Sequence, residues 1–106
     1  MLEFIETAIF TKRIEAHLSD EALRQLQIEL VLEPEKGSLI RGGSGLRKIR
    51  VVDKNRGKGK RGGLRVIYYL QQCEETAYLV FVYSKNESED LTPKEIKILR
   101  SLVEED

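Results

Sequence analysis

The chain has 106 residues, of which 41% are hydrophobic, with eighteen basic and eighteen acidic side chains. This length allows one domain with a modest core, so we expect a single domain over residues 1–106. The lone cysteine, Cys73, excludes an internal disulfide and suits a reducing compartment. No stretch has the pattern of a signal peptide or a membrane-spanning helix, and we therefore expect a soluble, cytoplasmic protein with no membrane partner.

The zero net charge hides an uneven distribution. The segment from Arg41 to Arg65, called the basic segment below, holds ten of the eighteen Lys and Arg residues, one acid (Asp53) and seven of the eight glycines. Its net charge is +9, and that of the remaining chain is −9. Glycine lets a backbone approach phosphates closely, and lysine and arginine neutralise them. We interpret the segment as a surface for a polyanion rather than as an ordinary solvated loop.

The first third of the chain changes from strand to helix periodicity. Residues 2–6 roughly alternate, which is typical of a short half-buried strand. An apolar residue every fourth position predicts a helix over residues 7–18, and Ser19 is a good N-cap for a second helix that Pro34 ends. The stripes expected to face the core are Phe10, Ile14 and Leu18, then Leu23, Leu26 and Leu30.

The rest of the chain predicts three strands and a helix. The strands cover residues 46–52, 64–70 and 76–84; a basic loop (residues 53–63) joins the first two and a polar turn (71–75) the last two. Thr92, Pro93 and Glu95 form a capping-box pattern that begins the last helix, whose apolar stripe is Ile96, Leu99, Leu102 and Val103. This order predicts an α+β domain: a mainly antiparallel four-stranded sheet, a helical hairpin and a C-terminal helix.

The residue types limit the chemistry. One histidine, one cysteine and no acidic pair at ligand spacing argue against a metal site or cofactor, and His17 fits a partly buried or capping role better than a catalytic one. Arg65 and Tyr83 fall on the two hairpin strands, where side chains on neighbouring strands converge. Such a set suits RNA cleavage by the substrate's own 2′-OH: a base deprotonates the hydroxyl, arginine neutralises the phosphate, and an acid protonates the leaving 5′-oxygen. Tyr83 has two other readings, a hydrogen-bonded strand-end tyrosine and a base-stacking residue.

Three blocks of sequence resemble the RelE/ParE toxin superfamily, specifically its HigB-like branch. They are GLRKIRV (residues 45–51), GKGKRGGLRVIYY (57–69) and YSKNESEDLT (83–92). The resemblance extends over the whole chain. It implies the type II toxin of a toxin–antitoxin system: a metal-independent, ribosome-dependent endoribonuclease that cuts translated mRNA in the A site and is silenced by a cognate antitoxin, here a HigA-like, DNA-binding protein.

The resemblance also assigns site residues. Arg65 matches the phosphate-stabilising arginine, and Lys48 and Arg50 match basic residues of the preceding strand. The chain departs from the RelE pattern after the last strand, where Lys85 and Asn86 replace an arginine, and residues 91–106 contain no tyrosine. The general acid therefore stays open between Tyr83, Lys58 and Lys60. The catalytic candidates are Arg65, Tyr83, Lys58 and Lys60, and the RNA-binding candidates are Lys48, Arg50, Lys54, Arg56, Arg61, Lys85 and Asn86.

Two other functions remain open from the sequence. ParE members of the superfamily inhibit DNA gyrase without nuclease chemistry, but ten cations in one segment fit an RNA-rich site better than a protein-only interface. A non-catalytic RNA-binding module would need exposed aromatic residues on the sheet, whereas we expect Tyr68, Tyr69 and Phe81 in the core. We expect an antitoxin to bind through an acidic or amphipathic segment, either covering the cationic surface or displacing the C-terminal helix.

Overall fold

The computed structural model describes residues 2–52, 63–71, 75–85, 87 and 90–103. Eight helices and strands occur within these ranges, and they follow the predicted order with one additional short strand. They are β1 (Glu3–Glu6), α1 (Ala8–His17), α2 (Asp20–Leu32), β2 (Ser38–Leu39), β3 (Leu46–Val51), β4 (Leu64–Gln71), β5 (Thr76–Ser84) and α3 (Pro93–Ser101).

The strands form one sheet in the order β1-β5-β4-β3-β2. β1 runs parallel to β5, and the other described pairs are antiparallel. The expected α+β fold with a mainly antiparallel sheet is thus confirmed, but the expectation of four strands is wrong, since there are five in the described residues. The additional strand, β2, has two residues, which is too short to produce an alternating pattern in the sequence.

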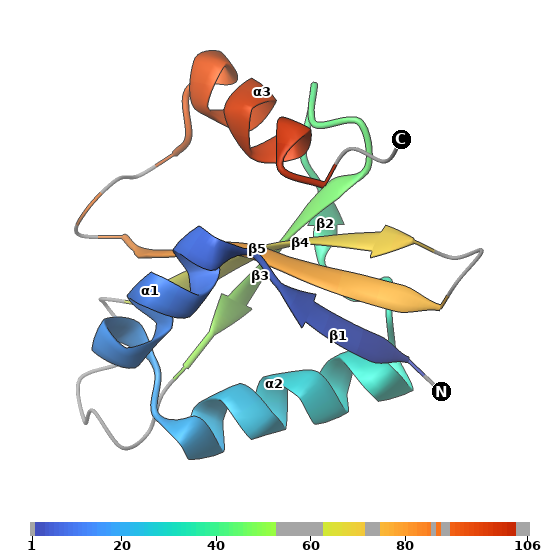
Figure 1. Ribbon diagram of the computed structural model, residues 1–106, viewed down its shortest axis with the longest axis vertical. Coiled ribbons are helices and arrows are strands. Elements are labelled where there is room, and N and C mark those ends of the chain that lie inside the picture. Colours follow the sequence, from blue (N-terminus) through green and yellow to red (C-terminus); the bar gives the residue numbers. More distant parts are fainter. Residues whose placement is uncertain (1, 53–62, 72–74, 86, 88–89, 104–106) are drawn as a thin grey trace.

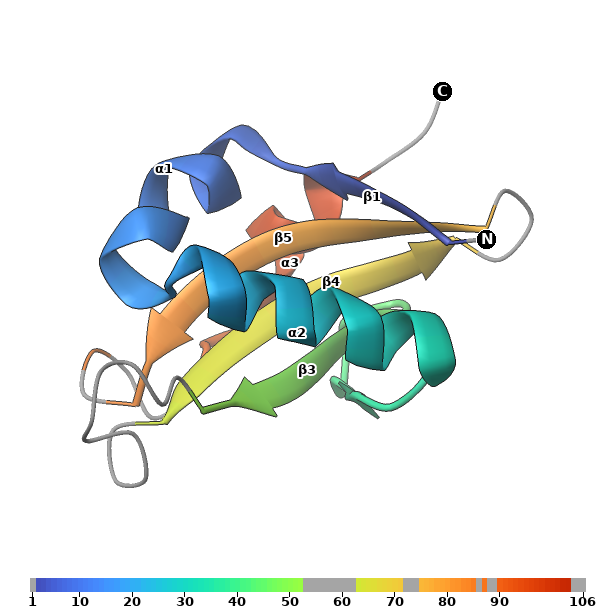
Figure 2. The ribbon, with the colours of Figure 1, turned by 90° about the horizontal axis from the view of Figure 1, so that it is seen from below.

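The two expected N-terminal helices pack on one face of the sheet, and α3 packs on the other (Figure 1). Figure 2 shows α1 beside the end of β5 and α2 in front of β4. Phe10 of α1 and Leu26 and Leu30 of α2 are buried against strand residues such as Val66 and Tyr68. Burial of these apolar side chains explains why two short helices are stable here. Ser19 caps α2 as predicted, because its side chain accepts a hydrogen bond from the backbone of Ala22 at 3.1 Å.

The capping box predicted for α3 is present. Thr92 accepts a hydrogen bond from the backbone N–H of Glu95 at 3.1 Å, and the Glu95 carboxylate accepts one from the backbone of Thr92 at 2.8 Å. Leu99 and Val103 are buried against the sheet, whereas Leu102 is 47% exposed, contrary to its predicted core position. The helix ends at Ser101 and Leu102 is its C-cap residue, so Leu102 no longer follows the helical spacing on which the prediction was based.

A short turn between β2 and β3 contacts residues on the face of the sheet that α3 covers. Gly45 has a φ of +101°, and a Cβ atom on it would lie 2.8 Å from the ring of Tyr69. Arg100 at the end of α3 lies 4.5 Å above the same ring and donates to the carbonyl of Ser44 at 2.9 Å. These contacts connect the C-terminal end of α3 to the turn. Within the described residues no helix has the length and hydropathy needed to cross a membrane.

Candidate phosphate-binding site

Three side chains form a row across the three central strands. Arg50 of β3 is paired with Arg65 of β4, and Arg65 is paired with Tyr83 of β5. Residues paired across a sheet project to the same face, so all three lie on the side that α3 covers. Lys48, two residues before Arg50, shares this face as predicted. The register therefore brings together four of the predicted site residues.

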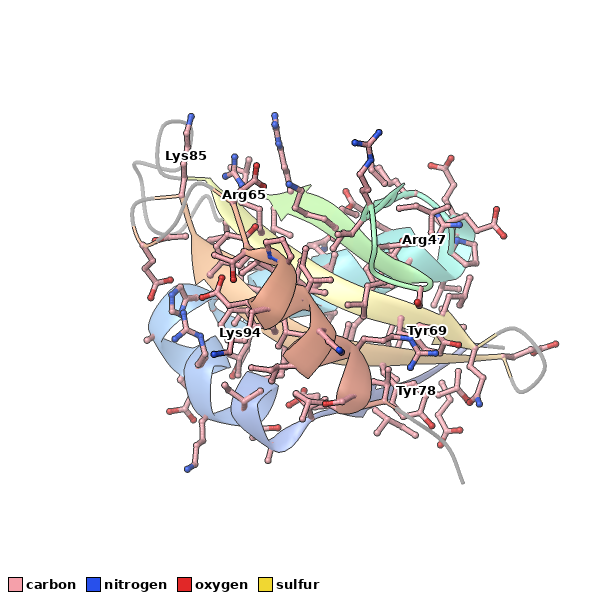
Figure 3. The ribbon with its side chains drawn as sticks, turned by 90° about the horizontal axis from the view of Figure 1, so that it is seen from above. Arg47, Arg65, Tyr69, Tyr78, Lys85 and Lys94 are labelled. Atoms are coloured by element: carbon pink, nitrogen blue, oxygen red, sulfur yellow. The ribbon has the colours of Figure 1, made fainter. Side chains whose placement is uncertain are left out.

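The row lies at the end of the sheet where β3 and β5 finish and β4 begins (Figure 2). Lys85 follows β5 directly, and Figure 3 shows Arg65 and Lys85 at this same end, with Tyr69 and Tyr78 toward the other. The carbonyl of Gly63, just before β4, accepts hydrogen bonds from Lys85 N at 3.2 Å and from Arg65 Nη1 at 2.9 Å. One backbone oxygen therefore connects the two strand ends that carry the cations.

Arg65 is only 8% exposed. Besides the bond to Gly63, its Nε has no hydrogen-bond partner, and no ion pair to it occurs among the described residues. A buried guanidinium needs an anion or several acceptors to compensate its lost hydration. The planar fork of arginine suits two oxygens of a phosphate. Arg65 is therefore a cation with donor capacity left for an anionic ligand.

Tyr83 is 2% exposed, and its hydroxyl also lacks a partner in the described part of the chain. Burial raises the pKa of Tyr83, the negative charges of Asp90 and Glu95 raise it further, and the opposing effect of Arg65 is smaller than that of Asp90. The phenol is therefore neutral at physiological pH, and it can donate a proton but is a poor base. Because the oxygen is closed to solvent here, a substrate reaches it only after the side chains above it move.

The other described cations differ in whether contacts within the protein already engage them. Lys48 contacts Asp90 at 3.4 Å, which pairs it weakly at the surface. Arg50 and Lys85 are exposed, so they can reach a ligand outside the fold. Arg47, on the opposite face, donates to the carbonyls of residues 35 and 37 and so has a structural role. The predicted site residues Lys54, Arg56, Lys58, Lys60, Arg61 and Asn86 lie outside the described residues, and their roles stay predictions.

Two acids next to the row were not predicted from the sequence. Asp90 faces Lys48, and Glu87 is bound by Arg13 and His17 of α1. Their partners are 42 to 74 positions away in the chain, so no local pattern could reveal them. His17 is partly buried, as predicted, and lies within hydrogen-bond distance of Arg13 O and Glu87 Oε1. Within the described ranges no three His, Cys, Asp or Glu side chains are grouped to hold a metal ion.

A cavity of about 450 Å³ lies at the opposite end of the sheet. Its lining includes Leu2, Val31, Pro34 and Leu70, and no residue of the basic segment contributes to it. Its charged lining residues are glutamates 33, 35 and 75 and Lys36, so that acids outnumber bases. A lining with excess negative charge disfavours phosphate, and this cavity therefore does not serve the arginine row.

Comparisons with known proteins agree with this architecture. The family model described as "RelE toxin of RelE / RelB toxin-antitoxin system" matches residues 4–105. Among solved structures, a double arginine-to-alanine variant of the E. coli toxin RelE in its free state shares 18% sequence identity, with a TM-score of 0.57 over 83% of this chain and 87% of that one. At this identity the structural match supports the fold, and the family model, which covers nearly the whole chain, supports the membership. The protein therefore belongs to the RelE toxin family of toxin–antitoxin systems.

Proposed function

We propose that this toxin is a ribosome-dependent, metal-independent endoribonuclease of the HigB-like branch, which cleaves translated mRNA in the A site. The observation that carries the proposal is the row of Arg50, Arg65 and Tyr83, in which a buried arginine with no anionic partner among the described residues lies beside a buried tyrosine. Such a set can bind and neutralise a scissile phosphate. The 2′-OH of the same nucleotide attacks that phosphate and leaves a 2′,3′-cyclic phosphate.

In this mechanism each described residue has one role. Arg65 neutralises the charge that develops on the phosphate, and Arg50 and Lys85 hold neighbouring phosphates of the strand. Tyr83 protonates the leaving 5′-oxygen, because its phenol carries its proton at neutral pH. The general base is assigned to a lysine of the basic segment, with Lys58 and Lys60 as candidates. Crowding by other cations lowers the pKa of a lysine and makes it a base near neutral pH.

The described acids near the row are engaged elsewhere, which supports a base from the basic segment. The Glu87 carboxylate accepts hydrogen bonds from Arg13 and from Ser84 N, and Asp90 lies against Lys48. The hydrogen bonds to Glu87 lower the pKa of its carboxylate and so make it a poor base. The uneven charge also favours RNA over a protein target. The basic segment, with a net charge of +9, attracts ribosomal RNA, whereas the −9 remainder of the chain is repelled by it, so that the protein would bind through the basic segment.

Cleavage in a reconstituted translation system tests this function. Purified wild type should cut mRNA only while it is translated, and Arg65→Ala should slow cleavage by a factor on the order of 10²–10³, equal to about 3 kcal/mol of transition-state stabilisation. The matched control is Arg24→Ala, which removes an exposed arginine on the opposite face of the sheet and should retain wild-type cleavage. A supercoiling defect without cleavage would support gyrase inhibition instead, and ribosome binding without either effect would indicate an RNA-binding module.

We also propose a HigA-like, DNA-binding antitoxin as the partner of this toxin. Family membership implies a toxin–antitoxin pair, and the exposed cations Arg50 and Lys85 offer a surface to an acidic segment. Expression of the toxin alone should stop growth, and coexpression of the adjacent open reading frame should restore it. Failure of any neighbouring gene product to copurify with the toxin would count against this partner.

A further inference from the structure

Side chains at the start of helix α1 and within it bond to the part of β5 that is not paired with β1. β1 pairs only with residues 76–79 of β5, which leaves the site end of that strand without a neighbour on this edge. Thr7, the N-cap of α1, donates its Oγ1 hydrogen to Val80 O at 2.7 Å, and Arg13 Nε donates to Val82 O at 2.7 Å. An unpaired strand edge leaves backbone groups unsatisfied. Side chains of α1 satisfy them here, next to Tyr83.

The same arginine binds the turn that follows β5. Arg13 Nη2 donates to both carboxylate oxygens of Glu87 at 2.8 Å, and His17 Nε2 lies 2.9 Å from one of them. Glu87 also accepts from Ser84 N at 2.8 Å, and its own N–H donates to Ser84 O at 3.0 Å. Burial by itself raises the pKa of Glu87, but these hydrogen bonds outweigh it and lower the pKa to about 2. The carboxylate is therefore ionised at any physiological pH.

Lys85 lies inside this turn. Its backbone N–H donates to Gly63 O, the oxygen that also accepts from Arg65 Nη1. A shift of the turn would therefore move Lys85 and break its hydrogen bond to Gly63 O, the same oxygen that holds the Arg65 side chain. Arg13 is also placed 4.6 Å above the ring of Phe81, whose centroid is 6.0 Å from that of Tyr83. One cluster thus contacts the surroundings of three predicted site residues.

We propose that Glu87, together with Arg13 and His17, is a positioning residue that fixes the end of β5, so that Lys85 and Arg65 meet the same stretch of RNA backbone. This inference rests on the nuclease function proposed above. Glu87 and Arg13 are partly exposed, and an ion pair of this kind makes only a modest contribution to stability. Its geometric effect is larger, because small misplacements of a group that contacts the reacting phosphate slow a reaction strongly.

The test is a double-mutant cycle measured as single-turnover cleavage on translating ribosomes. Glu87→Gln should lower the cleavage rate about tenfold with an unchanged affinity for the ribosome. Replacing Glu87 in a Lys85→Ala background should lower the rate less than threefold, because one of the two cations that it positions is already absent. The matched control is Glu29→Gln on α2. It removes a carboxylate of similar exposure, which pairs with Lys36 at 3.6 Å, and it should leave the cleavage rate unchanged.

Amide hydrogen exchange supplies a second readout that does not depend on catalysis. Glu87→Gln should speed exchange at Ser84 and Lys85, whose N–H groups are hydrogen-bonded at this strand end, and leave exchange in β3 unchanged. Equal losses in both backgrounds, or unaltered cleavage by Glu87→Gln, would overturn this inference alone. If wild type does not cleave mRNA, the proposed function fails, and this inference fails with it.

Discussion

Loss of the hydroxyl should change the free energy of unfolding differently at two buried tyrosines, Tyr68 and Tyr83. Tyr68 is 0% exposed, its hydroxyl donates to Pro34 O at 2.8 Å, and it accepts from Gly37 N at 2.9 Å. Tyr68→Phe removes both bonds and leaves the N–H of buried Gly37 without a partner. Loss of the bond to Pro34 O costs about 1 kcal/mol, and the stranded Gly37 donor costs about 1–3 kcal/mol, so we expect a total loss of about 2–4 kcal/mol.

Tyr83 provides the matched comparison. It is 2% exposed, and its hydroxyl has no partner in the described residues. Tyr83→Phe removes a desolvated group that forms no bond, so the free energy of unfolding should be unchanged or rise by about 1 kcal/mol. Cleavage should nevertheless fall, since the proposed proton donor is lost. A substitution that preserves the fold and lowers activity indicates a residue whose polarity serves function rather than stability.

Urea unfolding followed by circular dichroism measures both effects. The midpoints of the two variants should differ while the slopes agree, because the surface exposed on unfolding is the same. Native domains are stable by about 5–15 kcal/mol, so the loss expected for Tyr68→Phe is readily detected. Equal destabilisation by the two substitutions would refute the assignment of a satisfied hydroxyl to Tyr68 and an unsatisfied one to Tyr83.

Three further predictions follow from local geometry. Gly45→Ala should destabilise the protein by about 1–3 kcal/mol more than Gly42→Ala, as measured by thermal unfolding. Both glycines have a positive φ, but only a Cβ atom at position 45 would contact Tyr69, at 2.8 Å. Equal losses of stability in the two variants would contradict this contact. Because the pKa of Glu87 is about 2 in the fold against an ordinary 4.5, its carboxylate stabilises the protein above pH 4.5 and loses this effect as the pH falls toward 2. The stability difference between wild type and Glu87→Gln should narrow over that range, and a constant difference would contradict the ion pairs. Thr92→Ala should cost about 1 kcal/mol by removing the capping box of α3, as measured by urea unfolding, and a neutral result would show that packing alone fixes the helix start.

Much of the fold was predictable because its signals are local. The caps at Ser19 and Thr92 and the stripes of the first two helices act within a few residues, and the structure confirms them. Strand β2 was missed because its two residues extend the sheet through pairing with Lys48 and Arg47, which is a tertiary effect. The exposure of Leu102 likewise depends on where α3 ends on the sheet.

The site was predictable only in part, for a related reason. Alternation on β3 placed Lys48 and Arg50 on one face, and hairpin pairing placed Arg65 beside Tyr83. The cluster of Arg13, His17 and Glu87 joins residues about seventy positions apart, and nothing in the local sequence marks such a contact. The raised pKa of the Tyr83 phenol also required the fold, because its main cause is burial.

The central claim is that Arg65 binds the scissile phosphate of ribosome-bound mRNA. Single-turnover cleavage of mRNA on translating ribosomes, with wild type and Arg65→Ala compared at saturating toxin, tests it most directly. The account predicts ribosome-dependent cuts by wild type that end in 2′,3′-cyclic phosphates, and a rate lower by a factor on the order of 10²–10³ for a variant that remains folded. Wild-type cleavage rates for Arg65→Ala, or no cleavage by wild type under translation, would contradict it.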